Sequence, residues 1–337
     1  MRVHAPGKLI LSGEHAVVYG HPALAMAINR YAVATASLEK TPHVSFDLSD
    51  LSSQEHKLSL FALEQLKNRI KRKYQRFIKG DFKIRDVLQK PVELAQFAFS
   101  LFVETLNIKL THGVKIHVQS DIPMGCGMGS SAATILSIVH AIAHYLRIEL
   151  PPEIFFRLGL EAENVQHGFS SGLDLRVSLH GGCMYIKDGE IYSRSVPTLP
   201  MYMINTGTPE SSTGECVTAV AHHFKEKQIG KHFSAVTDAM DLALQSDNLS
   251  AVLQAIAENH HLLSTIGVVP EKVQHFIREI EQANGAAKIC GAGAISGDKA
   301  GIVLAVTEDQ AALEEICSRY HYSILPITGE ARGVHVV

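Results

Sequence analysis

The sequence lacks tryptophan, has few cysteines and carries no surplus of either charge. Its 337 residues include five cysteines without a CxxC pair or the Cys/His spacing of a zinc site, namely Cys126, Cys183, Cys216, Cys290 and Cys317. An odd, scattered set argues against a disulfide framework and fits a reducing compartment best. The 31 Lys+Arg against 34 Asp+Glu residues give a net charge of −3. Nothing global therefore favours nucleic acid or an anionic membrane as a partner.

Long apolar stretches are also missing. No segment reaches the roughly 18 apolar residues that a membrane span needs, and residues 1–7 contain no apolar core of a secretory signal. We therefore expect a cytoplasmic protein without a membrane partner. What is present, 46% apolar and 19% charged residues, is typical of a soluble globular protein.

The chain length predicts two domains, because single hydrophobic cores stop growing at about 250–300 residues. We place the boundary near residue 185, which gives an N-terminal domain over 1–185 and a C-terminal domain over 186–337. Apolar periodicity predicts the following elements: two strands separated by a turn at Pro6-Gly7, a half-buried strand over 114–118, helices over 130–146 and about 151–166, strand-like structure after Gly168, and mixed helices and strands towards the C-terminus.

A basic amphipathic helix is predicted between Leu63 and Lys79. Apolar residues recur there at helical spacing, and the opposite face carries seven Lys or Arg residues. A solvated charged face over a buried stripe outweighs the alternative, which is recruitment of phosphate or of an acidic partner.

A glycine-rich loop precedes the helix predicted over 130–146. Gly125, Gly127 and Gly129 alternate with other residues immediately before Ser130. Glycine lets a backbone approach a ligand closely, and the free N–H groups at a helix N-terminus attract anions. The loop has neither the GK[ST] ending of a Walker A motif nor the GxGxxG spacing of a dinucleotide fold. A purely structural tight turn is the alternative.

The whole string from Pro123 to Ala133 resembles the phosphate loop of the GHMP kinases, P-x-x-x-G-[LM]-G-S-S-A-A. This resemblance implies that the loop wraps the phosphates of ATP through Pro123, Gly125, Gly127, Met128, Gly129, Ser130, Ser131 and Ala132. It also implies that the Ser131 hydroxyl is a ligand of Mg²⁺, which prefers oxygen donors.

A second segment with polar residues in unusual places runs from Ala5 to Gly20. Lys8 stands between a Pro-Gly pair and an apolar strand, and Glu14-His15 is flanked by glycines. An exposed hairpin is the alternative. The segment resembles the opening motif of GHMP kinases, and its form GEHAVVYG is most similar to mevalonate kinases. The resemblance implies that Lys8 is catalytic and that Glu14 and His15 bind the substrate.

The third segment places two carboxylates eleven residues apart, Glu163 and Asp174, around a Gly-Phe-Ser-Ser-Gly turn. We expect one on a helix and the other on a loop facing the same cleft, although a helix N-cap or surface position would also explain Asp174. The string resembles the mevalonate kinase segment E-x-x-x-H-G-x-P-S-G-x-D. By that resemblance Glu163 is a magnesium ligand and Asp174 is the catalytic base, while Phe169 and Ser170 depart from the usual Asn/Thr-Pro pair.

Weaker similarities follow in the C-terminal half. Thr213, in a segment like T-G-x-x-x-S-T, and Gly291 and Gly293, in the glycine motif that begins at Lys288, are candidate substrate contacts by the same resemblance. A segment like N-x-x-L-L-x-x-x-G-V begins at Asn259. The glycine motif departs from the family pattern over residues 294–301, where two glycines are replaced and the loop is lengthened.

Together these motifs imply a two-domain α+β GHMP kinase fold, with a left-handed βαβ crossover in the N-terminal domain and a ferredoxin-like C-terminal domain. The implied activity is ATP- and Mg²⁺-dependent phosphorylation of the primary hydroxyl of mevalonate. The alternatives are another GHMP kinase, acting on phosphomevalonate, a sugar or heptose, or homoserine, and a catalytically silent relative that acts as a sensor. The predicted partner is a small-molecule substrate, and a homodimer is left open.

Overall fold

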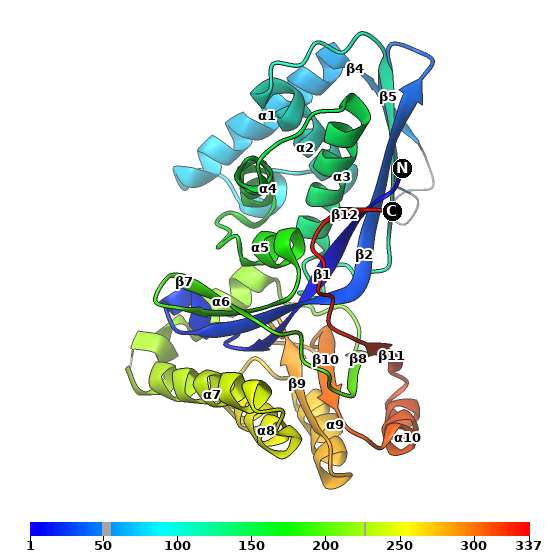
Figure 1. Ribbon diagram of the computed structural model, residues 1–337. Helices are drawn as coiled ribbons and strands as arrows, with labels where there is room; N and C mark the ends of the chain where they lie inside the picture. Colours follow the sequence, from blue (N-terminus) through cyan, green and yellow to red (C-terminus); the bar gives the residue numbers. More distant parts are fainter. Residues whose placement is uncertain (49–54, 226) are drawn as a thin grey trace.

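The computed structural model describes residues 1–48, 55–225 and 227–337. In this part of the chain the larger of two sheets has eight strands, in the order β12-β1-β2-β5-β3-β4, with β6 paired to β2 and β7 paired to β6 (Figure 1). Its strands are β1 (Val3–Ser12), β2 (Ala23–Glu39), β3 (His43–Leu48), β4 (His56–Ser59), β5 (Gly113–Ser120), β6 (Cys183–Lys187), β7 (Glu190–Arg194) and β12 (His335–Val336). All paired strands are antiparallel except β3 and β5.

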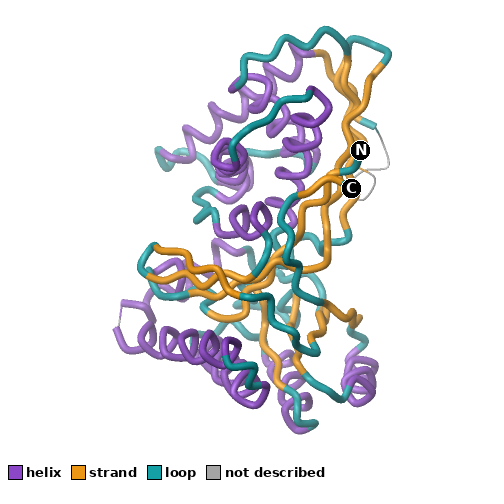
Figure 2. Tube along the Cα trace, in the orientation of Figure 1, coloured by secondary structure: helices purple, strands orange, loops and turns teal. Residues whose placement is uncertain are grey.

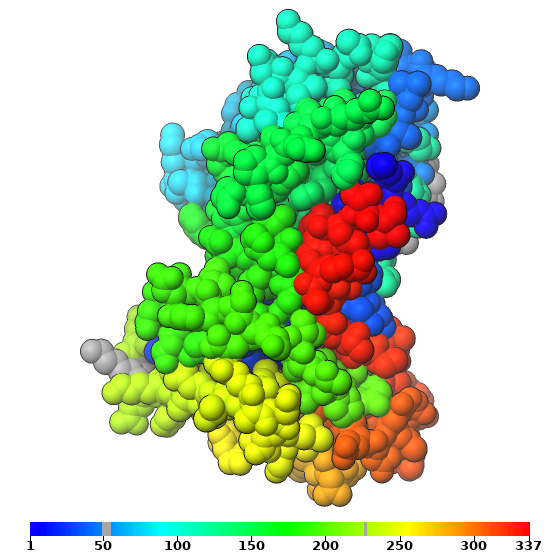
Figure 3. Space-filling model, viewed as in Figure 1, coloured from blue at the N-terminus to red at the C-terminus, as the bar shows by residue number. Residues whose placement is uncertain are grey.

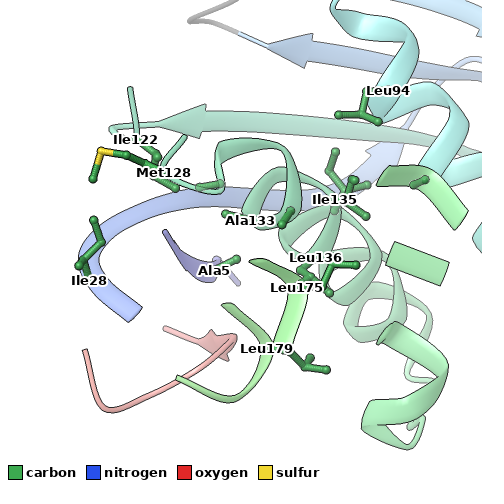
Figure 4. Packing of buried hydrophobic residues seen from close by; sticks show 14 of the residues in the cluster. Ala5, Ile28, Leu94, Ile122, Met128, Ala133, Ile135, Leu136, Leu175 and Leu179 are labelled. Carbon is green, nitrogen blue, oxygen red and sulfur yellow. The ribbon is translucent and has the colours of Figure 1, made fainter. Parts of the chain in front are cut away.

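Helices gather on one side of this sheet (Figure 2). They are α1 (Leu60–Ile78), α2 (Val92–Thr105), α3 (Ser130–Leu146), α4 (Pro152–His167) and α5 (Leu173–His180), with the short 3₁₀ turn η2 (Ile84–Asp86). A second 3₁₀ turn, η1 (Ala16–Tyr19), packs instead against the core of the smaller sheet. Helix α3 lies centrally, where Ile135 and Leu136 pack among apolar residues of β1, α2 and α5 (Figure 4). The end of α3 that faces the glycine loop is thereby held in a rigid core.

The smaller sheet is antiparallel, with the strand order β11-β8-β10-β9. Its elements are β8 (Met201–Asn205), α6 (Thr213–Lys225), α7 (Lys227–Gln245), α8 (Leu249–Thr265), α9 (Glu271–Gln282), β9 (Ala286–Cys290), β10 (Ile302–Val306), α10 (Gln310–Tyr320) and β11 (Ser323–Ile327). A helical connection after the first strand and another after the third give the split βαβ arrangement of ferredoxin-like domains. The predicted α+β class is thus confirmed.

One apolar core joins the two sheets. It includes side chains of β1 and β2 together with Met201, Met203 and Leu304 from the smaller sheet. The chain also returns to the larger sheet at its end, where β12 pairs with β1, and Figure 3 shows the last residues lying beside the first. The domain boundary near 185 and the hand of the crossover stay predictions. Strands β7 and β12 belong to the larger sheet although both follow residue 185.

Two expected elements differ from the structure. The turn at Pro6-Gly7 is a register shift within one continuous strand, β1. There the Lys8 N–H donates to the Met128 carbonyl at 3.0 Å, and a side chain at Gly7 would lie 3.1 Å from that oxygen. The strand expected after Gly168 is instead helix α5. Its apolar residues alternate like those of a strand because α5 is enclosed by β1, α3 and α4.

The basic helix α1 has a structural role. Lys67 and Lys71 both contact Glu104 of α2, at 2.6 and 2.8 Å, and Arg69 contacts Glu93 at 2.6 Å. These ion pairs engage much of the positive face, which supports the structural alternative for this helix. No helix in the described ranges is long and apolar enough to cross a membrane.

Candidate active site

A cleft of about 680 Å³ collects most of the predicted site residues. Its wall includes Lys8, Glu14, His15, Pro123, Gly125, Gly127, Met128, Gly129, Ser130, Ser131, Glu163, Asp174, Thr213 and Gly291. Two predicted residues are not part of that wall. Ala132 is buried inside the first turn of α3, and Gly293 packs so closely on Val268 that an added Cβ would overlap the Val268 carbonyl oxygen.

The glycine loop enters α3 through left-handed backbone conformations. The φ angles of Gly125, Gly127 and Gly129 are 69°, 76° and 71°, a region that glycine occupies without steric cost. Gly129 immediately precedes α3, so the unpaired N–H groups of the first helical turn lie at the cleft, where they favour an anion. At Gly129 an added Cβ would lie 2.9 Å from Cγ of Lys8, so glycine also makes room for this lysine.

Lys8 and Asp174 form an ion pair in the cleft, with Nζ and Oδ1 3.1 Å apart. The lysine side chain is 5% exposed and that of the aspartate 30%, so the carboxylate keeps one side towards the cleft. Asp174 lies in the first turn of α5, after Gly172, not on the loop that we expected. Negative charge is favoured at this end of a helix.

Glu163 stands beside this pair on α4 and is only 2% exposed. Burial first, and then the nearby charge of Asp174, raise its pKa to about 7. Its Oε1 accepts a hydrogen bond from Ser131 Oγ at 3.3 Å, and its Oε2 accepts one from Ser170 Oγ at 2.6 Å. The Ser131 hydroxyl also lies 3.2 Å from Nε2 of His167.

A hydroxyl and a carboxylate so close together are hard oxygen donors of the type that Mg²⁺ binds. The described residues contain no cluster of three or more His, Cys, Asp or Glu side chains able to hold a metal. This agrees with Mg²⁺, which usually takes one or two protein ligands and completes its shell with phosphates and water. The residues present therefore fit a magnesium ion bound together with a nucleotide.

Glu14 is held below the cleft by a buried network. It forms an ion pair with Lys288 of β9, whose Nζ also donates to the carbonyls of Ile10 and Ile289 at 3.1 and 3.0 Å. Asn259 Nδ2 donates to the other carboxylate oxygen of Glu14 at 3.3 Å. Both oxygens are thus engaged within the protein, and substrate binding by Glu14 stays a prediction.

His15 joins the cleft to the C-terminal glycine motif. Its Nε2 lies 2.9 Å from the carbonyl oxygen of Ala292, and its Nδ1 is buried without a partner among the described residues. Burial lowers the pKa of this ring, so His15 favours the neutral form.

The lengthened loop after Gly293 is anchored away from the cleft centre. Ser296 Oγ lies 3.1 Å from Ser211 Oγ, and the Ala300 N–H donates to Thr206 Oγ1 at 2.9 Å. Gly291, before this loop, lies against Gly127, since an added Cβ on Gly127 would be 3.0 Å from Cα of Gly291. The extra residues therefore pack on the segment that leads to Thr213 and leave the contact with the glycine loop intact.

The sequence reasoning missed one wall of the cleft and several supporting residues. Residues 84–95 form that wall and bring Arg85 and Lys90 to it, with no ion pair recorded for either cation in the described part of the chain. No sequence signal marked this wall. Lys288 and Asn259, by contrast, stand at the first positions of motifs noticed for their glycines and leucines, and their polarity in apolar surroundings was the available signal.

Comparisons with known proteins agree with this geometry. The family described as GHMP kinases N terminal domain matches residues 93–182, which include the glycine loop, Glu163 and Asp174. The mevalonate kinase of Thermococcus sibiricus is 29% identical over 304 residues, covering 86% of this chain and 85% of the relative. That of Archaeoglobus fulgidus is 30% identical over 301 residues, covering 87% and 89%. The chain belongs to the mevalonate kinase family of GHMP kinases.

Solved structures show the same fold for this GHMP kinase. The Methanococcus jannaschii mevalonate kinase matches with a TM-score of 0.83 and 24% identity, covering 98% of both chains. The L. major mevalonate kinase, solved with R-mevalonate, matches with a TM-score of 0.73 and 20% identity, covering 99% of this chain and 97% of that one. At such identities the likeness supports the architecture of the GHMP kinase family.

Proposed function

We propose that this kinase transfers the γ-phosphoryl group of ATP to the primary hydroxyl of mevalonate and so forms 5-phosphomevalonate. The observation that carries the proposal is the Lys8–Asp174 pair, 3.1 Å apart, in one cleft with the glycine loop and Glu163. Phosphoryl transfer depends on positioning and charge stabilisation more than on covalent help from the protein. This cleft supplies groups of both kinds.

Asp174 is the proposed general base. Its partly exposed carboxylate accepts the proton of the substrate hydroxyl, a contribution of about 10²–10⁴-fold in rate for groups of this kind. Lys8 holds that carboxylate in place and provides positive charge where the alkoxide develops. The N–H groups at the start of α3, with the loop from Gly125 to Ser131, hold the phosphates.

Ser131 and Glu163 would hold Mg²⁺, through the hydroxyl and the Oε1 atom that already face each other. When bound, the ion supplies charge neutralisation for the β- and γ-phosphates. Before nucleotide binds, the neighbouring Asp174 carboxylate and burial both oppose negative charge on Glu163. A cation bound at this position would stabilise the negatively charged form of Glu163.

The choice of mevalonate rests on the relatives and on residues around the substrate end of the cleft. The relatives described above are named mevalonate kinases, and His15 and Thr213 line the cleft as the motif similarity predicts. Because Lys8 and Lys288 are already paired with Asp174 and Glu14, Arg85 and Lys90 are the cations of the described cleft wall that are available for a carboxylate substrate. The five cysteines are all free, which supports a cytoplasmic location.

The decisive experiment is a coupled assay of ADP release with mevalonate, phosphomevalonate, homoserine and galactose as acceptors. We expect turnover with mevalonate well above that with the others. Asp174→Asn should lower kcat by about 10²–10⁴-fold with little change in the Kd for ATP. Asp188→Asn, on the exposed turn between β6 and β7, is the control and should keep full activity.

Two outcomes would contradict the proposal. Preferred turnover of another acceptor would reassign the substrate within the GHMP kinases. ATP binding without ADP release for any acceptor would favour a catalytically silent sensor, although retention of Lys8, Glu163 and Asp174 in one cleft argues for an enzyme.

A further inference from the structure

Ser170 occupies the position where the family motif usually has proline. Proline could provide neither an N–H group nor a hydroxyl, and the structure uses both groups of the serine. The Ser170 N–H donates to Asn164 Oδ1 at 2.8 Å. Its hydroxyl donates to Glu163 Oε2 at 2.6 Å and accepts the Gly172 N–H at 3.0 Å. The substitution therefore creates three hydrogen bonds that the usual motif could not form in this way.

These bonds join the two elements that carry the acidic residues of the cleft. Glu163 and Asn164 belong to α4, and Gly172 is the N-cap of α5, whose second residue is Asp174. The bond to Oε2 fixes the rotation of the Glu163 carboxyl group, so that Oε1 faces the Ser131 hydroxyl at 3.3 Å. One hydroxyl thus sets both the carboxylate direction and the start of the helix that carries Asp174.

If the turn needed only hydrogen bonds to its own backbone, the Ser170 hydroxyl would not have to donate to Glu163. The neighbouring Ser171 shows the ordinary case, because its Oγ accepts the Leu173 N–H at 3.3 Å and has no recorded bond to a carboxylate. Ser170 differs because its hydroxyl reaches a carboxylate that is 2% exposed. A hydrogen bond to a charged acceptor in such surroundings is stronger and more directional than one to a neutral group.

We propose that Ser170 is a positioning residue that orients Glu163 for the cation bound with ATP and couples it to the helix carrying Asp174. This inference rests on the proposed function, since it takes Glu163 as a ligand of that cation. Groups that orient metal ligands in this way typically contribute 10–100-fold in metal affinity.

The test is calorimetric binding of a non-hydrolysable ATP analogue to the full-length protein, with Mg²⁺ and again in EDTA. For S170A we expect unchanged affinity in EDTA and a Mg²⁺-dependent gain in affinity that is reduced by about 10–100-fold. S170T retains the hydroxyl and should restore the gain. Ser100→Ala removes a buried hydroxyl that donates to the Gln96 carbonyl in α2, and it should match the parent protein.

An undiminished Mg²⁺ effect in folded S170A would overturn the proposal, as would equal losses with Mg²⁺ and in EDTA. Should S170A fail to fold, Ser170→Cys keeps the size of the side chain but donates only weakly. The same two binding measurements, with Mg²⁺ and in EDTA, are then made on that variant. Because the readout is nucleotide binding, it remains informative if mevalonate proves not to be the acceptor. Failure of the proposed function would instead appear in the acceptor assay.

Discussion

At the scale of single residues, Lys288 and Glu14 show how residues of the motifs can hold a site in place without themselves reacting. Lys288 is fully buried and Glu14 is 1% exposed, and the two form an ion pair on the side of β1 that faces β9. Removing one partner from a buried pair leaves an uncompensated charge. The pair therefore ties the Glu14-His15 segment to the smaller sheet.

We expect Lys288→Met to lower the free energy of unfolding by about 3–5 kcal/mol, because it leaves Glu14 charged and unpaired. The double variant Glu14→Gln/Lys288→Met should recover much of that loss, since no charge then remains buried. Urea unfolding of the single and double variants measures both values. A double variant no more stable than Lys288→Met would contradict this account.

Residue identities were the most predictable level of the site. Lys8, Ser131, Glu163 and Asp174 were chosen from motif positions, and the structure places all four in one cleft. The sequence could not reveal which way each of these side chains points. Glu14 lines the cleft, yet its two carboxylate oxygens contact Lys288 and Asn259, residues more than 240 positions away that only folding brings close.

At the scale of elements, the glycine loop meets the C-terminal glycine motif back to back. Gly127 lies against Gly291 and the Cys290 carbonyl, whereas nothing lies within 4 Å of an added Cβ at Gly125. Both loop glycines have positive φ angles. Alanine at either position meets the same backbone strain, and only Gly127→Ala adds a collision.

Gly127→Ala should therefore weaken ATP binding by more than tenfold, about 1.4 kcal/mol, because the loop must shift away from Gly291. Gly125→Ala is the matched control for the strain of a left-handed backbone, which costs about 1–2 kcal/mol, and it should weaken binding less. Titration calorimetry with ATP and Mg²⁺ compares them. Equal losses would show that contact with Gly291 does not shape the loop.

Elements with a clear start or a single buried face were predicted well. Helix α3 was expected over 130–146 and begins and ends there, because the glycine loop and a long apolar period define it. Helix α5 was missed because Leu173, Leu175, Val177 and Leu179 alternate with other residues. A helix enclosed on several sides lacks the polar face that would reveal the helical period of 3.6 residues in its sequence.

At the scale of the whole molecule, buried histidines link stability to pH. Burial first, and then the nearby His144, lower the pKa of His140 to about 4. The ring stacks on Phe155 with centroids 3.6 Å apart. Between pH 6.5 and 4 the unfolded chain therefore binds a proton at this residue that the folded protein does not. Stability must fall as the pH is lowered through this range.

His140→Gln should remove this contribution, which approaches about 1.4 kcal/mol per pH unit at most. We expect the variant to lose stability less steeply than the parent protein between pH 6.5 and 4, with the two curves parallel above pH 7. Urea unfolding at a series of pH values provides the comparison. Identical slopes for both proteins would show that His140 is not the group responsible.

The overall architecture could be predicted only through the motifs. Composition and periodicity indicated mixed helices and strands, whereas the ferredoxin-like type of the C-terminal domain was implied by the family resemblance, and the smaller sheet has the strand order β11-β8-β10-β9. The pairing of β12 with β1, and of β7 with β6, joins residues on both sides of the predicted boundary. Pairings between distant strands leave no mark in a local sequence pattern.

The core that runs unbroken from the larger sheet into the smaller one limits how ligands can enter. Close packing resists continuous deformation, so we expect the part of the interface that this core fills to move little. Access to the cleft would then depend on the short segments that line it, residues 84–95 and the start of α6. Small local movements of these segments would let the nucleotide and the acceptor enter, while Lys8, Glu163 and Asp174 keep their positions.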